Sequence, residues 1–272
     1  MAISNFKPLV WTKQIEMDLP KFTVLQEDCN MKFQGEVGLG KTVKIIGAAK
    51  PTVGTYVPGT DIADAETPAD TSVYLAVDQY KYTHFGVDDV DAAQAQPGVM
   101  EAYMQGSTEE LAEARDSFIA SLSQYAGSFS SSAAITTSAG AKTAIDTAFV
   151  ALWDNSVKIN SDVTITMTPW MYNLFKDKLT ELYTDNVALI KKGIVGMYNG
   201  AMVKISNNLY NDGTDDYMMI RTKNAIAFAS GISKVEPYRP DKQFVDAIKV
   251  LDTYGGKVVR PKEIYVIKAR KA

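Results

Sequence analysis

One stretch of the chain, residues 35–42, has the residue types and spacing of a phosphate-binding loop. It reads Gly-Glu-Val-Gly-Leu-Gly-Lys-Thr, which fits the pattern GxxxxGK[ST] in full. In nucleotide-binding enzymes the backbone N–H groups of this loop surround the phosphates, because the loop joins a buried strand to the N-terminus of a helix. The pattern therefore raises the hypothesis of a nucleotide-hydrolysing enzyme with Lys41 on the phosphates.

The residues on either side of this stretch do not suit that chemistry. Residues 27–34 lack the continuous apolar run of a central parallel strand. Residues 43–46 are Val, Lys, Ile and Ile, which favour a strand where the enzyme needs a helix. The acid Asp78 follows an apolar run and could hold Mg²⁺, but the proline and glycine residues of 51–72 oppose the helical crossover that parallel strands use. We interpret the match as accidental and keep a P-loop nucleotide-binding enzyme as a distant alternative.

The rest of the chain has few residues of the types that carry out catalysis or bind metals. The single cysteine, Cys29, excludes an internal disulfide, and its acidic neighbours would raise the pKa of the thiol, so we expect an ordinary packed residue. The single histidine, His84, is expected to be half-buried and hydrogen-bonded. Asp88, Asp89 and Asp91 are expected to complement the N-terminus of a helix rather than to bind an ion. We predict no enzymatic activity and no catalytic, cofactor-binding or metal site.

Composition places the chain among globular proteins with a substantial core. It has 272 residues, 46% of them hydrophobic, and a net charge of −4, enough for one large or two ordinary domains. Because it has no long apolar stretch and residues 1–11 lack a signal-peptide pattern, we predict no membrane association and a cytosolic site of synthesis and residence. Residues 257–272 carry six basic residues and one acid, so their charge of +5 leaves −9 for the remainder. We expect a solvated strand end there rather than a polyanion-binding tail.

The first third of the sequence predicts segments that need a partner surface. Residues 1–34 carry scattered apolar anchors interrupted by prolines and are expected to form an extended arm, lying on the body or on a neighbouring subunit. Strands are expected at 42–46, 52–57 and 72–82, forming a long two-stranded projection. Such a ribbon is marginal alone, so its stability must come from contact with something else.

A long helix and a second unit are expected next. Residues 99–126 have apolar residues at helical spacing (111, 114, 118, 122 and 125), with Gly106 and Ser107 as a candidate kink. The small residues of 127–140 predict a hinge and a domain boundary. Beyond it we expect an α+β layer that opens with a helix at 141–154, a strand at 163–167 and a helix begun by Thr168 and Pro169.

The remaining sequence is rich in strands. An Asn-Asp-Gly turn at 211–213 predicts a hairpin between strands 201–206 and 217–222. The pair Gly255 and Gly256 predicts a second tight hairpin, and Pro261 marks a strand end. The other strands expected are 224–229, 233–238, 249–254, 257–260 and 264–268.

The order of these elements resembles one family across nearly the whole chain, the HK97-fold major capsid proteins of tailed bacteriophages. The resemblance lies in the joint order of Gly40-Lys41-Thr42-Val43-Lys44-Ile45, Val77-Asp78-Gln79, Val87-Asp88-Asp89-Val90-Asp91, Met197-Tyr198-Asn199-Gly200-Ala201-Met202-Val203-Lys204-Ile205-Ser206 and Tyr254-Gly255-Gly256-Lys257-Val258-Val259-Arg260-Pro261. It implies an α+β fold with an N-terminal arm (1–34), an extended β-hairpin or E-loop (35–83), a peripheral domain (84–132 and 232–272) containing a spine helix (about 99–126), and an axial domain (133–231).

The same resemblance implies a structural role. Copies would associate as hexamers and pentamers into an icosahedral shell around double-stranded DNA, in a virion assembled in the host cytoplasm. Contacts with that DNA would be non-specific and salt-dependent. The short arm leads us to expect a separate scaffolding protein, with a portal as a further partner. The ribbon and the hinge would absorb the change between two shell arrangements.

Lys41, Lys44 and Lys50 in the ribbon are interpreted as solvated edge-strand charges, and no covalent cross-link is assigned to them. The alternative function is an encapsulin-like bacterial shell compartment of the same fold that encloses a protein cargo.

Overall fold

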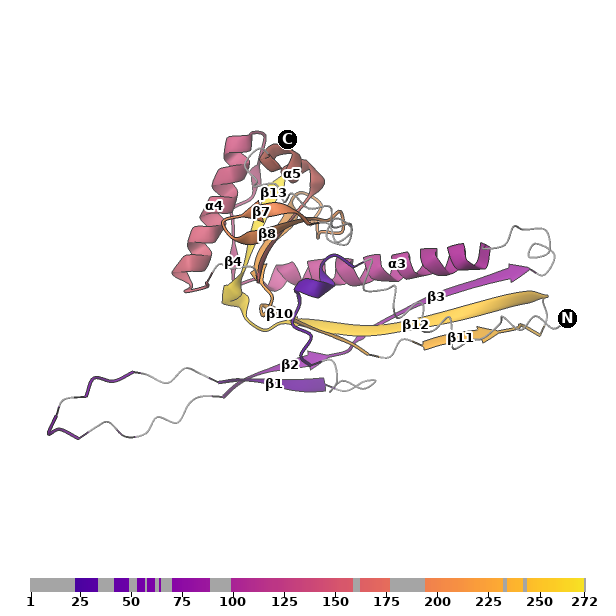
Figure 1. Cartoon of the computed structure of the whole chain (residues 1–272), viewed down its shortest axis with the longest axis horizontal. Coiled ribbons are helices and arrows are strands. Elements are labelled where there is room, and N and C mark those ends of the chain that lie inside the picture. The colour runs from indigo at the N-terminus through magenta and orange to yellow at the C-terminus, as the bar shows by residue number, and fades with distance from the viewer. Residues whose placement is uncertain are drawn as a thin grey trace.

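The structure is a computed structural model, and it describes residues 23–33, 42–48, 53–56, 58–61, 64, 70–88, 99–158, 162–176, 194–231, 234–241 and 244–271. These residues form a mixed α+β fold, as predicted. In Figure 1 a compact unit of helices and sheet stands at one end of an elongated unit, in which one long helix runs beside long strands. Residues 1–22 of the predicted arm and residues 35–41 of the predicted phosphate loop lie outside the described ranges.

The elongated unit is built around one long strand, β12 (Val245–Val258). β3 (Gln79–Asp88) and β11 (Lys234–Tyr238) pair with it antiparallel, and β10 (Ile226–Ser230) pairs antiparallel with its last residues. α3 (Val99–Ser121) covers one face of this sheet. The helix and sheet are joined by a small apolar core, which comprises Met104, Leu111, Ala112, Val235, Ile248 and Val250.

α3 confirms the predicted long helix. It begins at the predicted residue, continues through Gly106 and Ser107, and ends in the 3₁₀ turn η3 (Leu122–Tyr125). The helix buries more than apolar side chains, because Arg115 and Asp116 are only 3% and 2% exposed.

The compact unit contains a seven-stranded sheet with two helices packed against it. Its strand order is β4-β13-β9-β6-β8-β7, with β5 beside β13. The bounds are β4 (Ser128–Phe129), β5 (Ala133–Ala134), β6 (Val163–Met167), β7 (Ile194–Tyr198), β8 (Ala201–Ile205), β9 (Asp216–Thr222) and β13 (Ile264–Arg270). α4 (Ser138–Asp154) and α5 (Pro169–Phe175) share one large apolar core with the sheet, and Thr168 precedes Pro169 as the predicted N-cap.

β12 passes through Gly255 and Gly256 without a break, so the hairpin predicted at these glycines is wrong. A Cβ on Gly255 would lie 2.0 Å from the carbonyl oxygen of Ala76, and one on Gly256 would lie 3.0 Å from Cδ1 of Leu122. Ala76 ends β2 (Asp70–Ala76), which packs against β12 here. Gly255 therefore allows a close approach between two backbones, and Gly256 makes room for side chains of α3 and η3; neither forms a turn.

The strand predicted over residues 72–82 is two strands with different partners. β2 pairs antiparallel with β1 (Thr42–Ala48), whereas β3 pairs with β12, and the change of partner falls at residues 77–78. β1 confirms the first predicted strand. The described residues 53–56 form no strand, which contradicts that part of the strand predicted at 52–57, and they lie beyond the β1–β2 sheet, away from the elongated unit (Figure 1).

Residues 127–140, predicted as a hinge, are largely held to the sheet. β4 and β5 both pair in parallel with β13, and Thr137 accepts a hydrogen bond from the backbone N–H of Gly140 at the start of α4. The small residues allow the backbone of this segment to lie close to β13. From composition alone, the same residues predict a flexible segment.

The hairpin predicted between strands 201–206 and 217–222 is also wrong. β6 lies between β8 and β9 in the sheet, parallel to β8 and antiparallel to β9. The Asn-Asp-Gly turn is real, since Asn211 bridges to Asp216 across it, but it leads into β9 rather than joining two paired strands. A local turn signal gives no information on which distant strand inserts between its neighbours.

Candidate assembly surfaces and the buried charge cluster

The described part of the predicted phosphate loop does not have the geometry of a nucleotide site. Thr42, its last residue, begins a strand instead of a helix. β1 and β2 are antiparallel neighbours with Thr42 opposite Ala76, whereas the nucleotide hypothesis needs a parallel pair with a crossover. Asp78 follows β2 and accepts a hydrogen bond from the side chain of Gln79 at 3.1 Å.

The other residues that could do chemistry are used structurally. Cys29 is fully buried and donates to the carbonyl oxygen of Leu25 at 3.4 Å, and burial raises the pKa of its thiol, against the lowering effect of Arg221. His84 is exposed, not half-buried as predicted, because it points to the uncovered face of the sheet. Its Nε2 lies 2.8 Å from the hydroxyl of Tyr238, so the predicted hydrogen bond is present.

The predicted acidic helix cap is wrong for the residue that is described. Asp88 ends β3, opposite Val245, and is separated by ten residues from the start of α3 at Val99. Asp89 and Asp91 lie outside the described residues. Among the residues that the structure describes, no group of three or more His, Cys, Asp or Glu side chains could hold a metal ion.

The sheet face opposite α3 carries aromatic and aliphatic side chains in water. Because side chains alternate along a strand, every second residue of β3, β11 and β12 points to this face. Tyr82 is 75% exposed there and lies opposite Leu251, which is 36% exposed. Tyr80, at 53%, extends the same row. We call this surface the open sheet face; it comprises Tyr80, Tyr82, His84, Lys234, Glu236, Tyr238, Lys249 and Leu251.

The open sheet face contains a shallow groove of about 400 Å³, lined by Tyr82, His84, Lys234, Glu236, Lys249, Val250 and Leu251. The Lys249 ammonium lies 4.4 Å from the ring centroid of Tyr238, and that ring stacks on His84 with centroids 5.7 Å apart. Lys234 and Glu236 form an ion pair along the strand. The charges are thus paired at the surface, and the groove presents mainly apolar and aromatic area.

The interior beneath α3 has the opposite character. Arg115 forms a bidentate pair with Asp252 of β12, with Nε 2.7 Å from Oδ2. Lys204 of β8, 2% exposed, lies 2.8 Å from the carboxylate of Asp28. We call Asp28, Arg115, Asp116, Lys204, Arg221 and Asp252 the buried charge cluster. Its three cations and three acids balance when all are ionised, as a buried group of charges requires.

The buried charge cluster holds a short segment of chain, residues 23–30, which we call the strap. The strap includes the 3₁₀ turn η1 (Gln26–Asp28), and Leu25 and Cys29 are fully buried in the core between the two units. Asn30 bridges to Ala227 of β10. The strap therefore lies on the body of its own subunit, which is one of the two locations expected for the arm.

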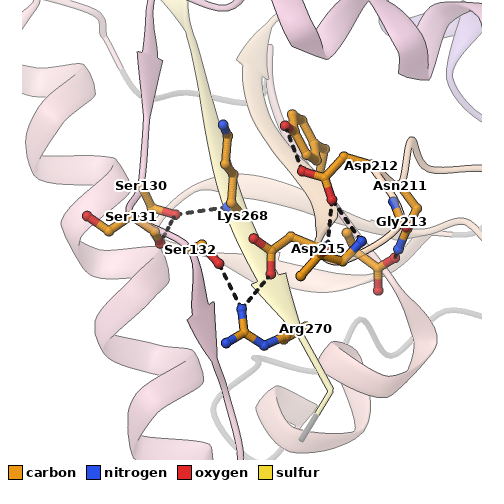
Figure 2. A network of polar contacts seen from close by, with 12 residues as sticks. Ser130, Ser131, Ser132, Asn211, Asp212, Gly213, Asp215, Lys268 and Arg270 are labelled. Carbon is orange, nitrogen blue, oxygen red and sulfur yellow. Dashed lines mark hydrogen bonds and ion pairs between the residues drawn. The ribbon is translucent and has the colours of Figure 1, made fainter.

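A second polar network joins β13 of the compact sheet to the segments on either side of it. Figure 2 shows the serines of residues 130–132 beside β13 and the turn before β9 on its other side. Ser130 Oγ accepts a hydrogen bond from the backbone N–H of Lys268 at 2.8 Å (Figure 2). The guanidinium of Arg270 donates to Ser132 Oγ at 2.8 Å and to the carboxylate of Asp215 at 3.2 Å. The Lys268 ammonium lies over two aromatic rings at the same place. Lys268 and Arg270 of the basic segment 257–272 thus make contacts within the subunit.

The buried charge cluster is the feature that sequence reasoning missed. The apolar residues predicted along the helix include Ala114, Phe118 and Tyr125, yet Tyr125 is 70% exposed. Apart from Met104, the residues actually buried on α3 come in adjacent pairs about one turn apart: 107 and 108, 111 and 112, 115 and 116, 119 and 120. Counting helical turns from the apolar pairs would have placed Arg115 and Asp116 inside.

Comparisons with solved structures agree on the fold. A chain of Mycobacterium phage Che8 is 30% identical, with a TM-score of 0.73 over 90% of both chains. The capsid structure of the cyanophage P-SCSP1u is 16% identical, with a TM-score of 0.71 over 92% of this chain and 89% of that one. A virus-like particle from Pyrococcus furiosus is 13% identical, with a TM-score of 0.59 over 97% of this chain and 100% of that one. No family model and no curated protein matches the sequence.

An elongated sheet with a long helix on one face, a compact α+β unit at its end and a two-stranded projection define a shell-forming fold. The chain belongs to the HK97-fold major capsid proteins of tailed bacteriophages. It is a structural component of a virion. No helix among the described residues is long and apolar enough to cross a membrane.

Proposed function

We propose that this chain self-assembles as hexamers and pentamers into an icosahedral shell around double-stranded phage DNA, and that it has no catalytic activity. The observation that carries the proposal is the likeness to the Che8 chain at 30% identity over 90% of both chains. The open sheet face supports it, because a row of tyrosines in water favours contact with other protein copies. Many such modest contacts can cooperate in a closed shell without any one being tight.

The proposed division of the chain follows this role. The expected division is residues 1–34 for the N-terminal arm, 35–83 for the E-loop, 84–132 with 232–272 for the peripheral domain, and 133–231 for the axial domain. The strand pairings adjust these bounds, because β10 and the whole of β3 belong to the elongated sheet and β13 belongs to the compact sheet. The position of β1 and β2 supports the E-loop assignment, since they form a separate two-stranded sheet that meets the body at β10 and β12.

The proposed partners beyond other copies are a separate scaffolding protein, a portal and packaged DNA. Assembly would take place in the host cytoplasm. The net charge of −4 supports weak, non-specific contact with DNA, because an acidic protein surface repels a polyanion.

Electron microscopy of the purified full-length protein, with and without scaffolding protein, tests the proposal. We expect closed particles with five-fold and six-fold clusters of subunits. A protein that stays strictly monomeric at every concentration, alone and with scaffold, would contradict it. The nucleotide hypothesis has a separate test: Lys41→Ala should leave ATP binding absent, as in the unchanged protein, whereas loss of a measurable affinity would restore the enzyme.

An encapsulin-like compartment enclosing a protein cargo remains the second candidate, because the Pyrococcus particle matches 97% of this chain. Its TM-score of 0.59 is below the 0.73 of the Che8 chain, which favours the phage shell. Particles purified from the natural source distinguish the two. Encapsulated double-stranded DNA supports the phage shell, and an encapsulated enzyme without nucleic acid supports the compartment.

A further inference from the structure

The basic side chains of the subunit include one group that is engaged inside it and another that lies on its surface. In the buried charge cluster, Lys204 donates to the carbonyl oxygen of Val24 at 3.2 Å, and Arg221 donates to that of Leu25 at 3.0 Å. Beside them the carboxylate of Asp116 accepts the backbone N–H groups of the same two strap residues at 2.7 and 3.1 Å. The charges of this inner group are thus used to hold the strap.

The surface group lies where the end of β12 pairs with β10. We call it the basic corner; its members are all exposed and comprise Lys32, Lys223, Lys257, Arg260 and Lys262. Lys257 lies opposite Ala227 of β10, and Asn30, two residues before Lys32, bridges to the same alanine. The backbone N–H of Arg260 donates to the carbonyl oxygen of Ala225, two residues after Lys223. Backbone contacts therefore bring three distant segments of the chain to one corner.

Most cations of the basic corner have no acidic partner within the subunit. Arg260 forms an ion pair with Glu263 at 2.8 Å. Asp162 also lies close, because its carbonyl oxygen accepts the backbone N–H of Lys223 at 3.0 Å. Among the residues that the structure describes, however, no carboxylate forms an ion pair with any of the four lysines. Such an excess of positive charge in water favours contact with an acidic surface.

The solvent side of α3 carries the opposite charge. Glu109, Glu110 and Glu113 are exposed there within about one helical turn. The helix has a single basic residue, Arg115, and that residue is buried. In the described part of the chain, no lysine or arginine forms an ion pair with the three exposed acids. The subunit thus presents an acidic surface as well as a basic one.

The two charged surfaces lie on opposite faces of the elongated unit. Gly256 faces α3, since a Cβ on it would lie 3.2 Å from the ring of Phe118. Because side chains alternate along a strand, Lys257 points to the other face. Its partner Ala227 packs on the β1–β2 sheet, which lies across the strands from α3 (Figure 1). One subunit therefore cannot bring its own two charged surfaces together.

We propose that the basic corner of one copy contacts the acidic side of α3 on a second copy. The inference rests on the proposed assembly into a shell. Two different surfaces that complement each other make a head-to-tail contact, and such contacts close rings when they repeat around an axis. DNA is another acidic partner for the basic corner, but it leaves the acids of α3 unexplained, whereas a second copy accounts for both surfaces.

Charge reversal in the full-length protein tests the contact. One variant carries Lys223→Glu and Lys257→Glu, and another carries Glu110→Lys and Glu113→Lys. Each should lower the assembled fraction in sedimentation velocity about tenfold at about 0.1 M salt, because like charges then face each other. A protein with all four changes should recover assembly, since opposite charges face each other again.

A matched control changes charge elsewhere on the surface. Lys158→Glu with Lys176→Glu reverses two exposed lysines of the compact unit, so the net charge changes by the same amount as in the corner variant. This control should assemble like the unchanged protein. Urea unfolding should give similar stabilities for all variants, because every substituted side chain is exposed.

A mixture of the two reversed variants shows whether the contact joins different copies. Alone, each variant places like charges against each other; mixed, the copies can alternate with opposite charges facing. The mixture should therefore associate where neither variant does. This readout needs no closed shell, so it decides the contact even if the unchanged protein forms no shells, a result that would contradict the proposed function.

Two results would overturn the contact between copies. One is assembly of both reversed variants at the level of the unchanged protein. If the corner variant then also retains less DNA in its particles, the basic corner binds DNA instead of α3. The other is failure of the mixture to associate while both variants remain folded in urea unfolding.

Discussion

The two faces of β12 differ, because a charged pair is buried on one and aromatic side chains lie in water on the other. Val250 and Asp252 point toward α3, and the carboxylate of Asp252 is held there by Arg115. Lys249 and Leu251, the alternate residues, point to the open sheet face beside Tyr82. A charged pair therefore lies inside, beside the apolar core, and aromatic side chains lie outside among paired charges, although most domains bury apolar groups and hydrate charges.

The difference between the two faces indicates a different role for each. An apolar row in water is stabilising only when another surface covers it, so the open sheet face is suited to contact between subunits. A buried ion pair contributes little net stability compared with apolar packing, but it tolerates only one arrangement of its partners. The buried charge cluster thus specifies how the strap, α3 and the compact sheet fit together.

Removal of the ion pair on the inner face of β12 should cause the largest loss of stability. Asp252→Ala leaves the buried guanidinium of Arg115 without its bidentate partner, and we expect a loss of about 3–5 kcal/mol in the free energy of unfolding. Lys142→Ala is the matched control, because it breaks the exposed Lys142–Asp146 pair of α4 and should cost no more than about 0.5 kcal/mol. Urea unfolding of both variants measures the difference, and equal losses would show that burial of the pair does not matter.

Substitution at the crossing of β2 and β12 should have the next largest effect. The Cβ of Gly255→Ala would meet the carbonyl oxygen of Ala76 at 2.0 Å, so one of two strands must move, and we expect a loss of at least about 1–3 kcal/mol. Gly106→Ala makes the same change in α3 where nothing lies within 4 Å, and should stabilise by about 0.5–1 kcal/mol. Thermal unfolding of the two variants should therefore shift in opposite directions. A neutral Gly255→Ala would contradict the close approach.

Gly255 also shows where sequence reasoning reached its limit. Periodicity and capping located elements whose signals are local, including α3, α4, β6 and the start of α5 at Pro169. The same local signals misread Gly255 and residues 127–140, because their explanation lies in Ala76 and in β13, which are distant in sequence. Pairing between strands that are distant in sequence has no signature in the residues that lie between them.

The functional surfaces were predictable to different degrees. The alternation of Tyr80, Tyr82 and His84 is visible in the sequence, but which face of the strand α3 covers is not. Arg115 and Asp116 were detectable from helical periodicity, and Arg221 stands in an apolar strand where its charge is a warning. Their common target, the backbone of the strap, could not be predicted, because backbone groups carry no sequence signal.

A fall in pH should change the stability contributions of a buried carboxyl group and a surface one in opposite directions. The pKa of Asp116 is raised by burial, so its contribution to stability is present in acid and is lost as the pH rises through about 6. Burial also acts to raise the pKa of Asp146, but hydrogen bonds from Lys142 and Tyr198 outweigh it and lower the pKa, so its contribution is lost as the pH falls. Between pH 7.5 and 5.0, Asp116→Asn should remove about 1 kcal/mol of acid stabilisation seen in urea unfolding. Asp146→Asn should not remove it, and identical pH profiles for the two variants would contradict the assignment.

Changing the outer face should have the smallest effect on the folded subunit and a large one on assembly. Tyr82 is 75% exposed, so Tyr82→Ser should change the free energy of unfolding by no more than about 0.5 kcal/mol. In an interface, loss of a buried tyrosine weakens each contact by about 1–2 kcal/mol, and a shell repeats that loss at every subunit. We therefore expect a several-fold drop in the assembled fraction measured by sedimentation velocity. Tyr125→Ser, a change of the same residue at 70% exposure on η3, is the control. Equal assembly of Tyr82→Ser and the unchanged protein would show that the open sheet face stays in water in the shell.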